Sequence, residues 1–348
     1  MSKPFNIAIL GAGVMGLSAA YALSRAGHKI TIFDPAGFPA DNASFMAGGM
    51  LAPYAEIEHM PYVWIKAGLH GIQNWQKIMP DQVVCNGSLL ITHDEDRYVL
   101  DRFKTHLPQG AAQDIGTNEL ESQLAERFPS AIYIQNEAHL NPHPVMQLMV
   151  NTLREKGVIL KTEKPSSLSA YDRVIDCRGM SAAADDPDLR GVKGEILIVE
   201  NREFSLSRPV RLMHPRYPLY IVPRADHIFM IGATSIESAG DHVTLRSGLE
   251  LMSALYSLHP SFAQARIVSL KAGVRPAYPD NLPRIRVDGN VIRCNGLFRH
   301  GFLLAPVMAE CVVDYIDGKE NEFSHLFLGV NYNENNNQRS EKNIHRAA

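Results

Sequence analysis

The sequence predicts an α/β fold in which a Rossmann-type domain, assembled from separate stretches of the chain, carries an α+β domain with an antiparallel sheet. A glycine-rich turn at residues 11–16 joins an apolar run to a helical one, as in a nucleotide-binding βαβ unit. Strand patterns typical of a buried parallel sheet return late in the chain, whereas residues 192–236 are rich in short strands. The length of 348 residues suits two domains, because single cores seldom grow beyond about 300 residues.

Composition and charge exclude several classes of protein. The chain is 45% hydrophobic and 20% charged with a net charge of −3, and no basic block recurs, so we expect no nucleic-acid partner. The four cysteines form no C-x-x-C pair, which argues against a metal site or a disulfide framework and favours a reducing compartment. The uncharged run at residues 7–23 is broken by glycines and is shorter than the about 20 residues of a membrane span. We therefore expect a cytoplasmic protein that does not contact a membrane.

The first 34 residues predict a dinucleotide site. In order they read as a strand, a glycine turn, a helix and a strand: Asn6–Leu10, residues 11–16, a helix to about Ala26, and Lys29–Phe33. Gly11 allows the tight turn, Gly13 lets the backbone approach a pyrophosphate, and Gly16 lets the helix pack on the strand. Asp34 follows the second strand, where a carboxylate binds a ribose diol and repels a 2′-phosphate. The motif disfavours NADP, does not separate NAD from FAD, and also occurs as a plain turn in unrelated α/β folds.

The segment from Ala43 to Pro53 favours FAD over NAD. It contains small residues and two adjacent glycines without a strand or helix period. A nicotinamide dehydrogenase would continue with strand–helix alternation here, whereas this composition suits backbone that passes close to a flat ligand. An ordinary surface loop is the alternative, but such loops are seldom this apolar.

Later elements predict how the chain divides between the two domains. Expected strands and helices include Ser88–Thr92, a charged helix over Glu119–Arg127, a helix from Val145 to Gly157, strands Val158–Lys161 and Arg173–Asp176, strands Glu195–Glu200, Leu219–Val222 and His227–Gly232, a helix Leu245–Leu258, strand Val291–Cys294, and a helix beginning near Leu303. We predict an FAD-binding domain from residues 1–82, 139–191 and 270–328, and a substrate domain from residues 83–138 and 192–269. The polar residues 329–348 are expected to be disordered.

Several motifs together resemble a known family. They are the glycine turn, Gly48-Gly49-Met50-Leu51-Ala52-Pro53, Tyr220-Ile221-Val222-Pro223-Arg224, Gly232-Ala233-Thr234, Ala272-Gly273-Val274-Arg275-Pro276, and the segment Phe298 to Pro306. Over residues 6–328 the chain resembles the flavin-dependent amine oxidases of the D-amino-acid oxidase superfamily, and among them the bacterial glycine oxidases of thiamine biosynthesis.

The resemblance implies a site for each partner of the reaction. It places FAD, bound non-covalently, against Gly11, Gly13, Val14, Met15, Gly16, Asp34, Ala43, Ser44, Gly48, Gly49, Met50, Gly179, Leu297, Phe298, Arg299, His300, Gly301, Phe302 and Leu303. It places the substrate carboxylate on Arg275, with Arg299 and Tyr220 nearby. From the residues alone, a solvated surface arginine before a proline turn is the favoured interpretation of Arg275. The alternatives for Tyr220 and Arg299 are a core-facing strand residue and half of a salt bridge at a helix start.

Three positions depart from the family pattern and bear on substrate preference. Arg178 stands where a small residue is usual, Pro218 where related enzymes can carry a histidine, and Phe45-Met46 where small residues are common. The histidines have no spacing typical of metal ligands, so we expect them to be structural or exposed and expect no metal.

The expected chemistry needs no obligatory acid or base. With the amine neutral, a hydride passes from the α-carbon of glycine or a similar small amino acid to the flavin, and the products are an imine or glyoxylate, ammonia and, with molecular oxygen, hydrogen peroxide. A guanidinium that grips the substrate carboxylate in two places fixes the α-carbon. The alternatives are another small amine (sarcosine, a D-amino acid or D-proline), another electron acceptor, an NAD-binding dehydrogenase, or a flavin-binding protein without turnover. The resemblance also implies a homo-oligomer, with a tetramer suspected.

Overall fold

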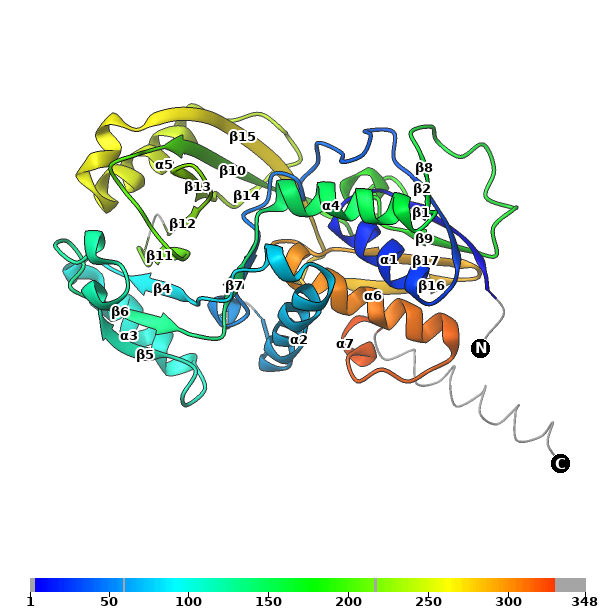
Figure 1. The fold of residues 1–348 in the computed structure, drawn as a ribbon, viewed down its shortest axis with the longest axis horizontal. Coiled ribbons are helices and arrows are strands. Elements are labelled where there is room, and N and C mark those ends of the chain that lie inside the picture. The colour runs from blue at the N-terminus through cyan, green and yellow to red at the C-terminus, as the bar shows by residue number, and fades with distance from the viewer. Residues whose placement is uncertain (1–3, 59, 216–217, 329–348) are drawn as a thin grey trace.

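The computed structural model describes residues 4–58, 60–215 and 218–328. The predicted disordered tail, residues 329–348, lies outside the described residues. Within them the strands form a six-stranded sheet, a nine-stranded sheet and a small two-stranded sheet. The two large sheets lie in separate lobes, with helix α2 and the small sheet between them (Figure 1). The predicted α/β class with a second region built on its own sheet is confirmed. That sheet is antiparallel, as predicted, except between residues 88–91 and 210–212, which pair in parallel.

The six-stranded sheet forms one lobe. Its strand order is β16-β17-β9-β1-β2-β8, and all neighbours are parallel except β16 and β17. The strands are β1 (Asn6–Leu10), β2 (Lys29–Phe33), β8 (Ile159–Lys161), β9 (Arg173–Asp176), β16 (Arg284–Asp288) and β17 (Val291–Asn295). The predicted strands of the first 34 residues match these bounds.

Helices pack beside this sheet around a common apolar core. They are α1 (Val14–Arg25), α2 (Tyr62–Ile78), α4 (Pro142–Glu155), α6 (Gly301–Asp317) and α7 (Ser324–Leu328). Helix α1 packs on α6 and α4 (Figure 1). Pro306 inside α6 has no N–H to donate to the carbonyl of Phe302, four residues earlier. That carbonyl instead accepts a hydrogen bond of 2.5 Å from Trp75 Nε1 of α2, so Trp75 joins the two helices through the acceptor that Pro306 leaves free.

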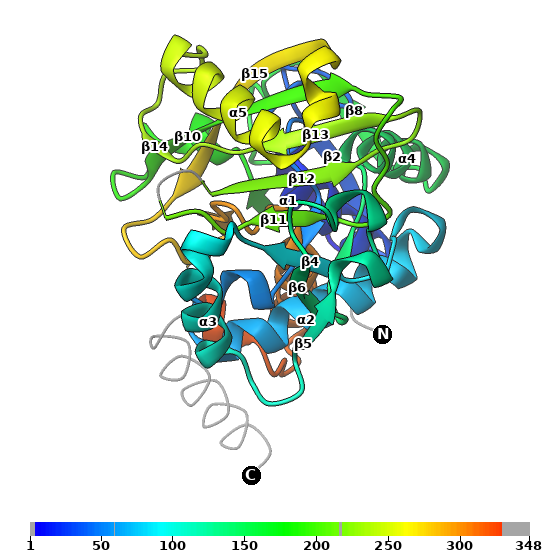
Figure 2. The same ribbon diagram turned by 90° about the vertical axis from the view of Figure 1, so that its left-hand side faces the viewer.

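The nine-stranded sheet forms the other lobe. Its order is β14-β10-β13-β12-β11-β4-β6-β5, and β15 pairs with β10. Figure 2 shows β13, β12, β11, β4 and β6 in succession, with α5 and α3 toward opposite ends. The elements are β4 (Ser88–Ile91), β5 (Gln113–Gly116), β6 (Ser130–Ile134), β10 (Arg190–Glu200), β11 (Val210–Leu212), β12 (Leu219–Pro223), β13 (Ile228–Gly232), β14 (Ile236–Glu237), β15 (Arg266–Ala277), α3 (Arg97–His106) and α5 (Leu245–Leu258). The small sheet pairs β3 (Met50–Leu51) with β7 (Ala138–His139).

Several predicted elements differ from the structure. Strand β10 begins at Arg190 and not at the predicted Glu195, and helix α4 begins at Pro142 and not at the predicted Val145. Residues 119–127 do not form one charged helix: two 3₁₀ turns, η4 (Thr117–Glu119) and η5 (Ser122–Leu124), replace it. Glu121 at their junction is buried against Ser207 and Arg208, so the backbone turns there. The helix predicted to begin near Leu303 begins at Gly301.

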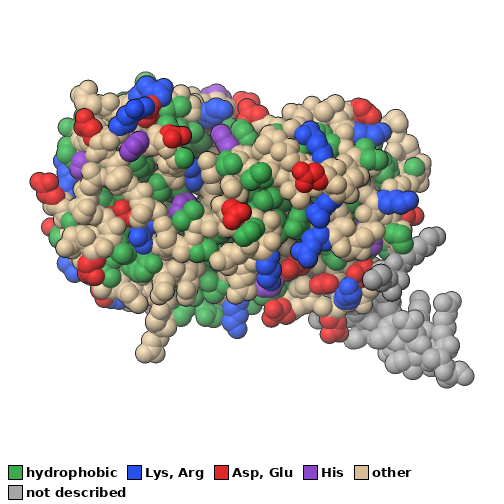
Figure 3. Space-filling view, viewed as in Figure 1, with side chains coloured by type: hydrophobic (Ala, Val, Ile, Leu, Met, Phe, Trp, Pro, Cys, Tyr) green, Lys and Arg blue, Asp and Glu red, His purple; other side chains and the backbone are tan. Residues whose placement is uncertain are grey.

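The predicted domain boundaries remain a prediction. Strand β15 begins before the predicted boundary at residue 270 and pairs along its length with β10. Among the described residues, no helix combines the length and apolarity needed to cross a bilayer. Basic and acidic side chains are interspersed on the face drawn in Figure 3.

Candidate active site

The carboxyl ends of four parallel strands meet at one cavity of about 450 Å³. Gly11 follows β1, Asp34 follows β2, Gly179 follows β9 and Leu297 follows β17, and all four line the cavity. Ligands of open α/β sheets bind at this edge, where the ends of the strands leave a crevice. The opposite wall is the face of the nine-stranded sheet that carries Tyr220 and Arg275.

Gly11 and Gly16 have the geometry that a tight turn and close helix packing require. Gly11 has a φ of +96°, and a Cβ there would lie 2.6 Å from the carbonyl oxygen of Cys177. A Cβ on Gly16 would lie 1.9 Å from the carbonyl oxygen of Gly11. Gly16 therefore holds α1 against the turn and does not line the cavity, whereas Gly11 and Gly13 do.

The small-residue segment after β2 passes along the cavity, as predicted. Ser44 Oγ accepts from the backbone N–H of Val14 at the start of α1 (3.1 Å). Further on, Arg224 donates to the carbonyl oxygens of Gly48 (2.5 Å) and Leu140 (3.1 Å). Burial lowers the pKa of Arg224 to about 10, and its role in holding this loop was not anticipated.

Asp34 stands at the end of β2, where a ribose would be recognised. One carboxylate oxygen accepts from the backbone N–H of Ala12 (2.7 Å) and the other from that of Ala36 (2.9 Å). These bonds fix the carboxylate at the cavity wall, and each oxygen has a further lone pair for a hydroxyl.

The start of α6 forms another part of the wall. His300, Gly301, Phe302 and Leu303 line the cavity at the first turn of this helix. The first backbone N–H groups of a helix have no intrahelical acceptor and carry partial positive charge. This end of α6 is therefore suited to stabilise negative charge in the cavity.

Arg275 lies partly buried on β15 and faces the cavity. Its Nη1 donates to the carbonyl oxygen of Thr234 (3.1 Å), and its guanidinium lies directly over Gly194 of β10, where a Cβ would come within 2.1 Å of Nη2. Burial lowers the pKa of Arg275, and the positive charge of Arg299 acts in the same direction. Among the described residues, no carboxylate lies within ion-pair distance of this guanidinium.

Arg299 and Tyr220 lie at the same end of the cavity. Arg299 Nη2 donates to Glu56 Oε2 (2.9 Å), and its guanidinium stacks over the Phe298 ring. The salt-bridge reading of Arg299 therefore holds, and Arg299 also lines the cavity. Burial raises the pKa of Tyr220, so its hydroxyl stays protonated and able to donate. Glu56 was not anticipated, because it lies 243 residues from its partner and belongs to no motif.

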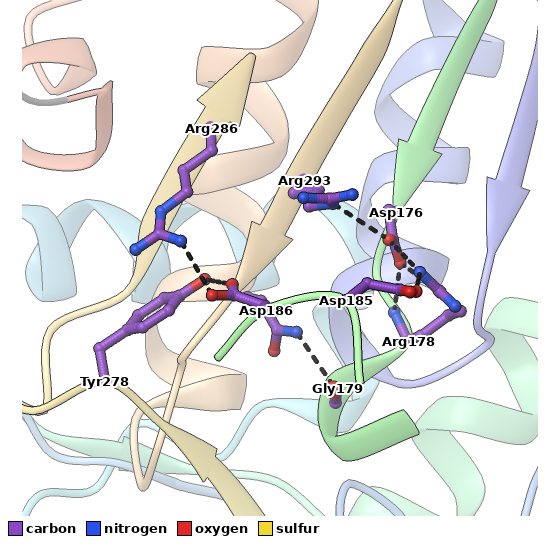
Figure 4. A network of polar contacts seen from close by, with 9 residues as sticks. Asp176, Arg178, Gly179, Asp185, Asp186, Tyr278, Arg286 and Arg293 are labelled. Carbon is purple, nitrogen blue, oxygen red and sulfur yellow. Dashed lines mark hydrogen bonds and ion pairs between the residues drawn. The ribbon is translucent and has the colours of Figure 1, made fainter. Parts of the chain in front are cut away.

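The three departures from the family pattern differ in where they lie relative to the cavity. Arg178 lines the cavity, but its guanidinium is held by Asp176 (2.8 and 2.7 Å) and Asp185 (2.7 Å), as Figure 4 shows. Met46 lines the cavity, whereas Phe45 stacks on His143 with ring centroids 3.8 Å apart. Pro218 is exposed and does not line the cavity.

A second polar cluster stands beside Arg178. Arg286 and the Tyr278 hydroxyl both donate to the buried carboxylate of Asp186 (2.9 and 2.7 Å; Figure 4). Asn295 Nδ2 donates to the carbonyl oxygen of Gly179 (3.0 Å). These contacts fix the turn after β9, which forms the cavity edge.

The residues present fit a bound dinucleotide. The glycine turn leaves room for phosphates, Asp34 can receive the ribose, and the backbone of the Gly48 segment and the start of α6 provide close walls for a flat ring. With an arginine available for a carboxylate, fold and site together define a flavin-dependent oxidoreductase.

Comparison with known proteins gives the family. A family model described as FAD dependent oxidoreductase, DAO, matches residues 6–315. A protein of Rhizobium etli assigned as a thiamine biosynthesis oxidoreductase, ThiO, is 44% identical over 87% of this chain and 94% of its own length. The glycine oxidase of Bacillus licheniformis is 26% identical over 91% of this chain and 94% of its own. The crystal structure of glycine oxidase from Geobacillus kaustophilus superposes with a TM-score of 0.80 at 22% identity, covering 94% of this chain and 99% of that one. The chain belongs to the DAO family of FAD-dependent oxidoreductases, and its cofactor is FAD.

The structure brings together nearly all of the predicted site residues. Every one lines the cavity except Gly16, which packs behind it. Their contacts with FAD and substrate remain a prediction.

Proposed function

We propose that the protein oxidises glycine or a similar small amino acid with molecular oxygen as acceptor, in the biosynthesis of the thiamine thiazole. The products would be an imine that hydrolyses to glyoxylate and ammonia, together with hydrogen peroxide. The names of the relatives at 44% and 26% identity support this assignment.

The observation that carries the proposal is the guanidinium of Arg275. It is partly buried, faces the cavity, and has no carboxylate partner among the described residues, whereas Arg299 beside it is paired with Glu56. A charge that is costly to bury and has no opposite charge beside it among the described residues calls for one from the substrate. A carboxylate that accepts two parallel N–H bonds from Arg275 supplies that partner and fixes the α-carbon.

The neighbouring side chains favour a small substrate. Met46, Met50 and Ile196 line the cavity and cluster with Tyr220. Apolar neighbours exclude water and strengthen the attraction between the guanidinium and the carboxylate. We infer that a bulky side chain at the α-carbon would meet these side chains.

The protein's part in catalysis is orientation and charge. When bound, FAD supplies the acceptor for a hydride from the α-carbon. Arg275 and the Tyr220 hydroxyl hold the carboxylate, and the positive end of α6 stabilises negative charge at the opposite wall. No side chain has to remove a proton if the amine binds neutral.

An amine panel tests the proposal. We expect glycine or sarcosine to bleach the bound FAD without oxygen, and to yield peroxide with it, faster than D-phenylalanine or D-proline. A catalytic efficiency at least tenfold higher for D-phenylalanine or D-proline, about 1.4 kcal/mol of preference, would overturn the glycine assignment. A protein that stays colourless after reconstitution with FAD would contradict flavin chemistry altogether.

We further propose non-covalent FAD, a cytoplasmic location and a homo-oligomer, suspected to be a tetramer. Four free cysteines are compatible with a reducing compartment. Release of FAD on acid precipitation and light scattering of the purified protein test the first and last points.

A further inference from the structure

A buried carboxylate lies behind the cavity wall. Glu137, between β6 and β7, is 2% exposed and does not line the cavity. One of its oxygens accepts from the backbone N–H of Ala55 (2.9 Å), and the other accepts a short hydrogen bond from the hydroxyl of Ser88 on β4. The mechanism above gives Glu137 no role, although burying a carboxylate costs free energy.

The residue that Glu137 contacts is held from a second direction. Arg211 of β11 donates from Nη1 to the carbonyl oxygen of Ala55 (2.7 Å). Ala55 is itself buried, in the 3₁₀ turn η1 (Tyr54–Glu56). The backbone N–H and the carbonyl oxygen of Ala55 are thus both hydrogen-bonded to side chains. Arg211 comes from the nine-stranded sheet, and Glu137 from the connection beside it. The backbone of η1 is fixed at this point.

The next residue reaches the substrate end of the cavity. Glu56 lines the cavity, and its carboxylate accepts from Arg299 (2.9 Å). Its negative charge also acts on Arg275 and on Tyr220. Any movement of η1 would therefore change both the position of Arg299 and the charge around Arg275.

We propose that Glu137 is a positioning residue: with Arg211 it clamps Ala55, and through Glu56 it sets the carboxylate-binding arrangement of Arg299 and Arg275. This inference rests on the proposed function only in taking a small carboxylate as the ligand. Glutamine at position 137 keeps an oxygen for the Ala55 N–H, and its amide N–H can donate to the Ser88 hydroxyl oxygen, which then acts as the acceptor of this hydrogen bond. Alanine leaves the Ala55 N–H buried without an acceptor.

The test uses FAD-loaded enzyme and glycolate, a two-carbon carboxylate without an amine, titrated by calorimetry. We expect Glu137→Ala to weaken glycolate binding roughly tenfold, since a buried donor loses its partner. The KM for glycine should rise in parallel, with a smaller change in kcat and no loss of FAD. Glu137→Gln should restore glycolate affinity to near the wild-type value. Should Glu137→Ala fail to fold, Glu137→Asp carries the test, because its shorter side chain withdraws the carboxylate from Ala55.

Glu121 offers a matched control. It too is a buried carboxylate that accepts from a serine hydroxyl and a backbone N–H, both of Ser207, but its partners lie away from η1. Glu121→Ala should lower the melting temperature and leave glycolate affinity unchanged.

Three results would overturn the proposal. They are wild-type glycolate affinity in folded Glu137→Ala or Glu137→Asp, an equal loss of affinity in Glu121→Ala, and no rescue by Glu137→Gln. If the wild type binds glycolate but does not oxidise glycine, the proposed function fails while the comparison of variants still decides this inference. If the wild type does not bind glycolate, the carboxylate site that this inference assumes is absent and the inference fails, whereas the proposed function is decided separately by the amine panel.

Discussion

Gly194 lines the cavity and offers a sharp test of the arginine site, because the three heavy atoms nearest to an added Cβ all belong to the guanidinium of Arg275. A Cβ at this position would lie 2.1 Å from Nη2, 2.3 Å from Cζ and 2.5 Å from Nη1 of Arg275. Ordinary van der Waals contact begins at 3.4 Å, so in Gly194→Ala the guanidinium must withdraw by more than about 1 Å. The obstacle is the end of a flexible side chain, so we expect the fold to tolerate the change.

The expected effect is on catalysis with the carboxylate substrate. A displacement of about 1 Å in a positioning group can cost on the order of a hundredfold in rate, and we expect a loss of that size in kcat/KM for glycine. FAD content, measured after acid release, should not change.

The control is Gly248→Ala on α5, where the added Cβ would meet only Leu270 Cδ2, at 3.3 Å. It should leave kcat/KM unchanged. Wild-type kcat/KM in a folded Gly194→Ala enzyme would refute the assignment of Arg275 as the carboxylate site.

Other variants test further parts of the structure. Arg275→Ala should lower kcat/KM for glycine by roughly thirty- to several-thousand-fold and leave the FAD content unchanged. Arg275→Lys should have a kcat/KM between those of the wild type and Arg275→Ala. Equal losses for glycine and for ethylamine, which has no carboxylate, would contradict this role of Arg275. Burial raises the pKa of Glu137 from 4.5 to about 7, although the Arg211 charge and two hydrogen bonds oppose it. Between these two pH values the folded state holds a proton that the unfolded state has lost. The free energy of unfolding should therefore fall as the pH rises, by up to about 1.4 kcal/mol per pH unit. Urea unfolding at several pH values should show a flatter slope in Glu137→Gln, and an unchanged slope would contradict this. Arg178→Ala removes a two-pronged partner from buried Asp176 and should lower the free energy of unfolding by about 1–3 kcal/mol, while the KM for glycine stays within twofold; a large rise in KM would place Arg178 at the substrate.

The parts predicted well from the sequence depend on local rules. The glycine turn, the strands beside it and α5 have periods or dihedral requirements that a short window of sequence reveals, and Leu245–Leu258 was predicted to the residue. The contact between Glu56 and Arg299 could not be predicted, because it joins distant positions through the packing of two lobes. The contact between Arg224 and the Gly48 loop could not be predicted for a similar reason. Arg224 lies in a recognised motif, but its acceptor is a backbone oxygen, which any residue could provide.

Neighbouring strands of the six-stranded sheet come from distant parts of the chain, and this affects how the protein folds during translation. The first βαβ unit leaves the ribosome early, yet β9 completes its neighbour contacts only when β17, residues 291–295, has been made. The start of α6, which closes the cavity, follows directly after. Until then the nascent chain carries an unpaired edge of a parallel sheet, the kind of surface that chaperones must shield. Because residues 297–303 line the cavity, we expect chains truncated before residue 291 neither to hold FAD nor to stay free of aggregation.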